Sequence, residues 1–163
     1  IWPGLFTSRI GAPTRDYQPD EIVQQVNVTR SRPLATGHMH FSMVALMQNR
    51  KGIADQLRTV SYTGPALVPA SPWLGNERPG TPQVTAVRRA KSVDLKLKAG
   101  SANALYAIWS RYGSEWRFAV APAVRVDWSI PDDTKLGAAD AVVVSAVDRL
   151  GNEGQRVRVW PKP

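Results

Sequence analysis

The stretch AADAVVVSAVDRLGNEG, residues 138–154, decides the fold of the second half of this chain. Its apolar run Ala141–Val147 has the composition of a buried strand, and Asp148–Gly154 is rich in residues that form turns. A second candidate strand follows at Gln155–Trp160. The stretch therefore predicts a β-hairpin at the end of an all-β region.

The region before this hairpin shows the same kind of pattern. Val93, Leu95 and Leu97 alternate with polar residues, as in a strand with one buried and one solvated face. Seven short candidate strands are separated by turn signals, which predicts an immunoglobulin- or fibronectin-III-like β-sandwich over residues 83–163. We expect Trp109 to be its core tryptophan. The candidate strands are Gln83–Arg89, Ser92–Ala99, Ala104–Arg111, Trp116–Ala121, Arg125–Ile130, Ala139–Val147 and Gln155–Trp160.

The first part of the chain, residues 1–61, alternates β and α patterns. Ile1–Ile10 and Gly37–Leu46 are predicted strands. One predicted helix begins at Pro19 and stops before Pro33, and a second, capped by Asn49, covers Arg50–Ser61 with Ile53, Leu57 and Val60 buried. Parallel strands are buried on both faces, so two βα units cannot close a core alone. This part therefore predicts the last two βα units of a β/α barrel.

A proline-rich strap, residues 62–82, joins the two parts. It contains five prolines, which exclude a helix or a central strand. We expect Leu67, Val68, Trp73 and Leu74 to hold it in place by being buried.

Composition excludes several kinds of site. The chain has no cysteine, which excludes disulfides, thiolate nucleophiles and thiolate metal sites. No apolar run approaches the roughly 20 residues of a membrane-spanning helix. The net charge of +8 is spread out and contains no long basic run, so solvated strand faces explain it better than attraction to an anionic polymer, either nucleic acid or cell-wall glycan. No glycine-rich phosphate loop or nucleophile elbow occurs, and no cofactor is expected.

Two segments carry a family resemblance. PDEIVQQVNVTRSRPLATGHMHFSMVALMQNRKGIADQL (19–57) and YTGPALVPASPWL (62–74) resemble the end of the barrel of family-10 glycosyl-hydrolase-like proteins. The GHMHFSM strand, the NRKGIADQL helix and the PALVPASPWL strap leading to a sandwich carry the match. The resemblance implies a bacterial protein that is secreted, periplasmic or lipid-anchored and acts on polysaccharide, including cell-wall glycan. It also implies that the rest of the barrel is a partner missing from this chain.

The resemblance places candidate substrate-binding residues at the carboxyl ends of the two strands. These candidates are Arg9, Asp16, His40 and Ser42. The catalytic carboxylates stay unknown, because such acids ordinarily lie on earlier barrel strands. The pair His38 and His40 can serve packing or hydrogen bonding, a substrate contact, or a metal ion, but the third ligand that a metal needs is missing, so no metal site is expected.

Three functions are compatible with the sequence. The favoured one is the C-terminal part of a glycoside-hydrolase-like protein, inactive alone, in which the sandwich is accessory. The alternative is a non-catalytic carbohydrate- or cell-wall-binding module that uses exposed side chains such as Trp116 or Trp128. The third, a nucleic-acid binder, is disfavoured because no recognition helix or paired stacking aromatics are found.

Overall fold

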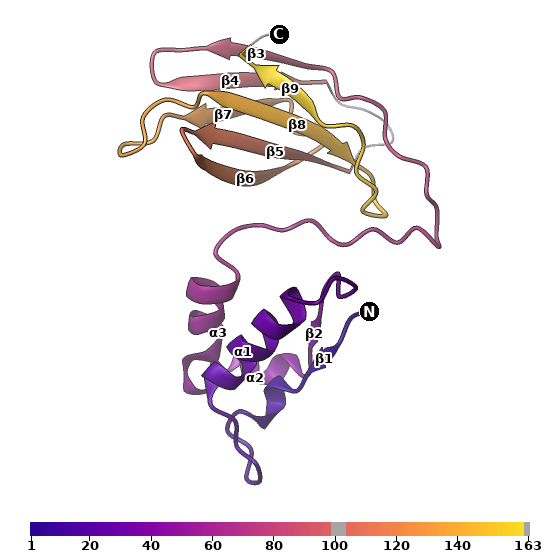
Figure 1. Ribbon diagram of the computed structural model, residues 1–163, viewed down its shortest axis with the longest axis vertical. Coiled ribbons are helices and arrows are strands. Elements are labelled where there is room, and N and C mark those ends of the chain that lie inside the picture. The colour runs from indigo at the N-terminus through magenta and orange to yellow at the C-terminus, as the bar shows by residue number, and fades with distance from the viewer. Residues whose placement is uncertain (99–103, 162–163) are drawn as a thin grey trace. The chain divides into compact units, whose positions relative to one another are not determined.

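The computed structural model describes residues 1–98 and 104–161, which divide into two compact units with the boundary between Thr63 and Gly64 (Figure 1). The first unit mixes short helices with two very short strands. Its elements, in chain order, are β1 Gly4–Leu5, η1 Thr7–Arg9, α1 Pro19–Arg30, β2 Met39–His40, α2 Met43–Met47, η2 Arg50–Gly52, α3 Ile53–Gln56 and η3 Leu57–Ser61.

Helix α1 begins at Pro19 and ends at Arg30, which confirms the helix predicted between Pro19 and Pro33. Pro19 stands in the first turn, where its missing N–H costs no hydrogen bond, and Asp20 and Glu21 complete an acidic first turn. The helix packs on β1 and α3 through one apolar cluster. This core of the first unit consists of Leu5, Ile10, Ile22, Val23, Val26, Ile53 and Leu57.

Both predicted strands of the first unit are far shorter than expected. After Leu5 the chain turns into η1, where the amides of Arg9 and Ile10 donate to the carbonyls of Phe6 and Thr7. The prediction of a strand over Gly37–Leu46 is wrong beyond His40, because α2 begins at Met43. Methionine and leucine have high helix propensity, so the alternation through this segment did not distinguish strand from helix.

The second predicted helix is also broken. Residues Arg50–Gly52 form a 3-10 turn, α3 spans only Ile53–Gln56, and Leu57–Ser61 widens into a π-helix. The wider turn changes which side chains face inward, because the Tyr62 amide donates to the Leu57 carbonyl five residues back. Ile53 and Leu57 are buried as expected, but Val60 is exposed and Ser61 takes the buried position instead.

All seven predicted strands of the second unit are present, with ends shifted by a few residues. Ala99, the predicted end of the second of them, lies outside the described residues. The strands are β3 Val84–Arg88, β4 Ser92–Leu97, β5 Leu105–Tyr112, β6 Glu115–Pro122, β7 Asp127–Pro131, β8 Ala141–Val147 and β9 Val157–Trp160.

These strands form a β-sandwich. One antiparallel sheet has the order β3-β4-β7, and the other has the order β6-β5-β8-β9. Buried side chains from both sheets form a single apolar cluster, among them Leu95, Ile130, Tyr106, Ile108 and Val144. The architecture predicted for residues 83–163 is therefore confirmed as a sandwich of three and four strands.

Two expectations about tryptophan burial are wrong. Trp109 points away from the core on β5, because Tyr106 and Ile108 point into it. Its ring lies tilted by 41° against that of Phe118, with ring centroids 5.2 Å apart. The strap residues Val68, Trp73 and Leu74 are exposed, also against expectation, whereas Leu67 is half-buried and Pro79 is buried. Hydrogen bonds to the strap backbone hold it to the sandwich instead. The Ser71 amide donates to the Leu150 carbonyl, and the Asn152 side chain donates through Nδ2 to the Gly75 carbonyl, both at 2.9 Å.

Candidate functional site at the carboxyl ends of β1 and β2

The two short strands pair in parallel, so their carboxyl ends lie side by side. Gly4 pairs with Met39 and Leu5 with His40. The pairing continues past the strands, because the Phe41 amide donates to the Leu5 carbonyl at 3.0 Å and the Ser8 amide donates to the Phe41 carbonyl at 3.1 Å. This brings together two of the four predicted site residues, Arg9 and Ser42, at the same end of the strand pair.

The face opposite the helices carries a stack of aromatic rings. The rings of Phe6 and Phe41 lie 4.6 Å apart at an angle of 27°, and both side chains remain exposed. Gly4 leaves room for this stack, because a Cβ there would lie 2.9 Å from the Phe41 ring. The aromatic pair was not predicted. Phe6 follows Gly4 by two residues, and Phe41 follows Met39 by two residues. This pattern indicates a ring pair only once the pairing of Gly4 with Met39 is known.

Arg9 extends this stack. Its guanidinium carbon lies 4.8 Å from the centroid of the Phe6 ring, and its Nη1 donates to the Thr14 carbonyl at 3.1 Å. Ser42 precedes α2, and its hydroxyl makes no hydrogen bond within the described residues. The site thus combines an apolar ring surface with guanidinium and hydroxyl donors, a combination that suits a ligand with both C–H faces and oxygen atoms.

His40 lies on the other side of β2. Because paired residues in a ladder point to the same face and Leu5 belongs to the helix-covered core, His40 faces the helices. Its Nδ1 lies 2.8 Å from the Thr7 hydroxyl and its Nε2 lies 2.6 Å from the Tyr62 hydroxyl. His38 Nε2 lies 2.5 Å from the same Tyr62 oxygen. These contacts give the histidine pair a structural role, and a contact of His40 with substrate stays a prediction.

The histidine cluster favours the neutral imidazoles. Burial lowers the pKa of His38, and the positive charge of Arg30 lowers it further. Burial likewise lowers the pKa of His40, with His38 adding to the effect. A neutral ring has one donor and one acceptor nitrogen, and a tyrosine hydroxyl can donate to one ring and accept from the other. The cluster therefore satisfies its own hydrogen bonds without a metal ion. Within residues 1–98 and 104–161, no group of three or more His, Cys, Asp or Glu side chains is placed to hold one.

Asp16 stabilises the loop between η1 and α1. Its Oδ1 accepts from the Gly11 amide at 2.7 Å and its Oδ2 lies 2.5 Å from Lys51 Nζ. The hydrogen bond from Lys51, followed by the one from Gly11, lowers the pKa of this carboxyl. The structure thus gives Asp16 two structural partners, and its contact with substrate stays a prediction.

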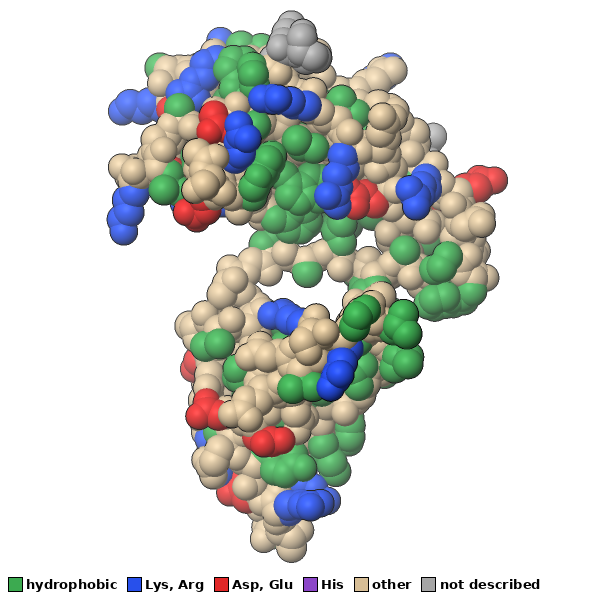
Figure 2. All heavy atoms as spheres, in the orientation of Figure 1, with side chains coloured by type: hydrophobic (Ala, Val, Ile, Leu, Met, Phe, Trp, Pro, Cys, Tyr) green, Lys and Arg blue, Asp and Glu red, His purple; other side chains and the backbone are tan. Residues whose placement is uncertain are grey.

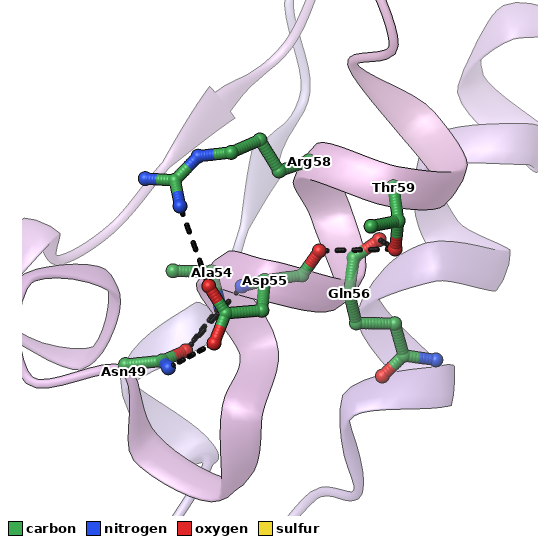
Figure 3. A network of polar contacts seen from close by, with 6 residues as sticks. All are labelled: Asn49, Ala54, Asp55, Gln56, Arg58 and Thr59. Atoms are coloured by element: carbon green, nitrogen blue, oxygen red, sulfur yellow. Dashed lines mark hydrogen bonds and ion pairs between the residues drawn. The ribbon is translucent and has the colours of Figure 1, made fainter.

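Asp55 belongs to the network that starts α3, shown in Figure 3. Asn49 has a left-handed backbone, and its Oδ1 accepts from the amide of Ala54 at 2.9 Å. Asn49 Nδ2 donates to Asp55 Oδ2 at 2.6 Å, and Arg58 pairs with Asp55 Oδ1 at 3.3 Å. The N-cap position of α3 is Gly52, so Asn49 does not cap a helix that starts at Arg50 as predicted. It precedes the 3-10 turn, and its side chain accepts from an amide in the first turn of α3.

The remaining carboxylates of the first unit also serve local structure. Glu21 accepts from Gln25 Nε2 at 2.8 Å, and Asp20 accepts from Gln56 Nε2. Each described carboxylate of residues 1–63 thus has a structural partner.

The charged side chains of the whole chain are spread out. On the face drawn in Figure 2, Lys and Arg side chains lie over the sandwich unit with Asp and Glu between them. Many of the cations are paired, for example Arg88 with Asp132 at 2.5 Å, Arg111 with Asp140 at 2.6 Å and Arg117 with Asp133 at 2.6 Å. No helix in the described part of the chain is long and apolar enough to cross a membrane.

One comparison with known proteins reaches across both units. A Bacillus subtilis (strain 168) protein is 39% identical over 147 residues, which cover 84% of this chain. That relative is named glycosyl hydrolase YngK. The chain is therefore homologous to a protein named as a glycosyl hydrolase, but it spans only 29% of the length of that relative. A comparison with protein-family models finds no match.

Solved structures match the chain only in part. A fibronectin III domain of human collagen XX has a TM-score of 0.40 and 20% identity, and covers 58% of this chain and 98% of that one. The glycoside hydrolase domain of Endo-D from Streptococcus pneumoniae R6 has a TM-score of 0.38 and 12% identity over 52% of this chain and 15% of that one. An Fn3-like protein from Clostridium thermocellum has a TM-score of 0.36 and 15% identity over 50% and 92%. The sandwich assignment rests on the strand order described above.

Proposed function

We propose that this chain acts as the C-terminal portion of a family-10-like glycosyl hydrolase on polysaccharide, with cell-wall glycan as a candidate substrate. The first unit supplies the last two βα units of a β/α barrel, and the sandwich is an accessory domain. The chain is inactive alone, because the catalytic carboxylates of such an enzyme would lie on the earlier barrel strands. A bacterial envelope location, secreted, periplasmic or lipid-anchored, suits such a substrate.

The observation that carries this proposal is the incomplete sheet of the first unit. Two parallel strands of two residues each have one helix-covered face, and both outer edges lack a neighbouring strand among the described residues. Parallel sheets occur with both faces covered, and open edges invite pairing. Further barrel strands on either side would complete the sheet.

The exposed apolar side chains support the same conclusion. Met39, Phe41 and Phe6 are 56%, 45% and 38% exposed on the face away from the helices, and Met43 and Met47 on α2 are 59% and 79% exposed. Exposed apolar surface of this extent in one small unit marks a contact surface. In a β/α barrel this face would point into the barrel interior, and the carboxyl ends of the strands would face substrate.

In this arrangement Arg9 and Ser42 are the best-placed substrate contacts. Arg9 can bind a hydroxyl or carboxylate through its free guanidinium nitrogen atoms, and Ser42 has a free hydroxyl at the same end. Asp16 would affect substrate binding by stabilising the loop between η1 and α1, and His40 would do so by fixing the position of β2. The catalytic carboxylates would come from the earlier strands of the completed barrel.

A chimera tests the proposal. This chain would replace the matching stretch of the Bacillus subtilis relative, and release of reducing sugar would be measured on the glycans that the intact relative cleaves. We expect the chimera to cleave them, and both the truncated relative and the isolated 163-residue chain to be inactive. Cleavage by the isolated chain, or a folded chimera without activity, would contradict the proposal.

Hydrogen exchange gives an independent test on the isolated chain. If the first unit lacks neighbouring strands, the amides of residues 1–61 should exchange much faster than those of residues 83–160, because opening costs little where few apolar contacts hold the backbone. Equal, strong protection of both units would show that the first unit is a self-sufficient domain and would refute the barrel assignment.

A further inference from the structure

The outer face of the three-stranded sheet has a hollow of about 530 Å³. The strand register arranges its floor in two rows that cross the sheet. One row runs from Thr85 through Lys96 to Asp127, and the other from Val87 through Asp94 to Ser129. A volume of this size is within the range of small-ligand sites.

The carboxylate in the centre of the hollow is held in place. Oδ1 of Asp94 accepts from the Ser129 hydroxyl at 2.7 Å and from the Ser92 hydroxyl at 2.9 Å, and Arg89 Nε lies 3.5 Å from Oδ2. The hydrogen bond from Ser129, followed by that from Ser92, lowers the pKa of Asp94. An oriented, ionised acceptor of this kind suits a ligand with hydroxyl groups.

Arg125 supplies the opposite charge. Its guanidinium carbon lies 4.6 Å from the centroid of the Trp128 ring, and its Nε donates to the Asp127 carbonyl at 3.2 Å. Both contacts orient the guanidinium at the rim of the hollow. Within the described part of the chain, the terminal nitrogen atoms of Arg125 make no hydrogen bond and no carboxylate pairs with it.

The charges of the hollow do not cancel. Its lining contains the cations Arg89, Lys96 and Arg125 and the anions Asp94 and Asp127, so one positive charge is in excess. Lys96 and Asp127 lie 3.9 Å apart, which leaves Arg125 as the cation without a partner. A ligand that complements this lining carries one anionic group for Arg125 and neutral hydroxyls for Asp94 and the serines.

We propose that this hollow binds a saccharide unit that carries a carboxylate. The carboxylate pairs with the terminal nitrogen atoms of Arg125, and a ring hydroxyl donates to Asp94. The choice of a saccharide, rather than another hydroxy acid, rests on the proposed action on polysaccharide. The choice of an acidic one rests on the charges of the lining alone. The sandwich would then hold an acidic glycan while the barrel acts on it.

Calorimetric titration of the 163-residue chain tests this site. The probes are a hexamer of galacturonic acid, a neutral hexamer of N-acetylglucosamine and a single-stranded oligonucleotide. We expect binding of the acidic hexamer and a loss of about tenfold or more in affinity with Arg125→Gln, because a charged hydrogen-bond donor is removed. Arg125→Lys should keep part of the affinity, since it keeps the charge but not the planar fork.

Arg149→Gln is the matched control. Arg149 is exposed and does not line the hollow, so this variant removes the same charge and should change affinity by less than about twofold. Circular dichroism shows whether each variant folds. Four results would refute the proposed site. They are equal losses of affinity in the two glutamine variants, equal binding of the neutral hexamer, tighter binding of the oligonucleotide at Arg125, and no binding at all. None of these results bears on the activity of the chimera, so the two proposals can fail separately.

Discussion

The turn between β8 and β9 should be intolerant of a side chain at Gly151. This residue has a φ of +81°, a left-handed conformation that favours glycine. A Cβ at Gly151 would also lie 2.7 Å from the Val68 carbonyl oxygen and 3.1 Å from both the Ala70 Cα and the Pro69 carbonyl oxygen. All three neighbours belong to the backbone of the strap, which cannot rotate away as a flexible side chain would.

Gly151→Ala therefore carries two costs, and Gly113→Ala carries only the first. Gly113 has a φ of +63° in the β5–β6 turn and open space around the position of a Cβ. The left-handed conformation costs an alanine about 1–2 kcal/mol in either turn. Overpacking against the strap adds about 1–3 kcal/mol at Gly151 alone. The free energy of unfolding should fall by about 2–5 kcal/mol for Gly151→Ala and by about 1–2 kcal/mol for Gly113→Ala.

Urea unfolding followed by tryptophan fluorescence measures this difference, because every tryptophan except Trp2 lies in the sandwich unit. The transition midpoint and the slope give the free energy of unfolding of that unit. If the two variants differ by less than about 0.5 kcal/mol, the strap does not press against the turn, and the close contact in the structure is not present in solution.

Three further predictions concern the core and the histidine cluster. Ile108→Ala, at a position only 1% exposed in the sandwich core, should lower the free energy of unfolding by about 2–5 kcal/mol in the same urea assay, and a loss below 1 kcal/mol would place Ile108 outside the core. Tyr112→Phe removes the hydrogen bond to the Pro131 carbonyl at 2.8 Å and should cost about 1 kcal/mol, so a variant as stable as the parent would show that this bond contributes nothing. His38 and His40 should titrate below the usual pKa of about 6.5 in an NMR titration of their ring protons, and a midpoint at or above that value for either would contradict the buried cluster. Because folding lowers both histidine pKa values, the unfolded chain binds more protons than the folded chain once the pH falls below about 6.5. The contribution of the neutral histidines to the stability of the first unit should therefore be complete above that pH and decrease as the pH falls below it.

The sandwich shows how much local patterning can predict. Strands can be identified without knowledge of their partners from the alternation at Val93, Leu95 and Leu97 and from the hairpin at residues 138–160. A strand with one solvated face alternates apolar and polar residues, and this period of two is visible in the sequence. The helix α1 is predictable for a similar local reason, since its start and end depend on Pro19 and Pro33. Local signals fail where a segment suits two structures, as at Met43–Met47, which alternates but forms a helix.

The candidate site could be predicted only in part. The family resemblance implied that Arg9 and Ser42 lie at the carboxyl ends of two parallel strands, and the pairing of Leu5 with His40 brings them to the same end. It did not indicate which way His40 points, because that depends on which face of β2 the helices cover. Asp16 was assigned to substrate because it lies in the loop after the first predicted strand. Its pairing with Lys51, 35 residues away in sequence, could not be read from that position.

The sequence by itself determined the all-β second half and the helix at Pro19, because these follow from the period of the side chains and from the backbone limits of proline and glycine. Only the tertiary structure decided that Trp109 points outward, that Ser61 replaces Val60 in the buried position, and that residues from β3, β4 and β7 form one charged hollow. The burial of Ser61 follows from the π-helix at Leu57–Ser61, whereas the other two depend on register between strands that are separate in the chain. A shift of one residue would turn every side chain of a strand to the other face, and no local pattern encodes that choice.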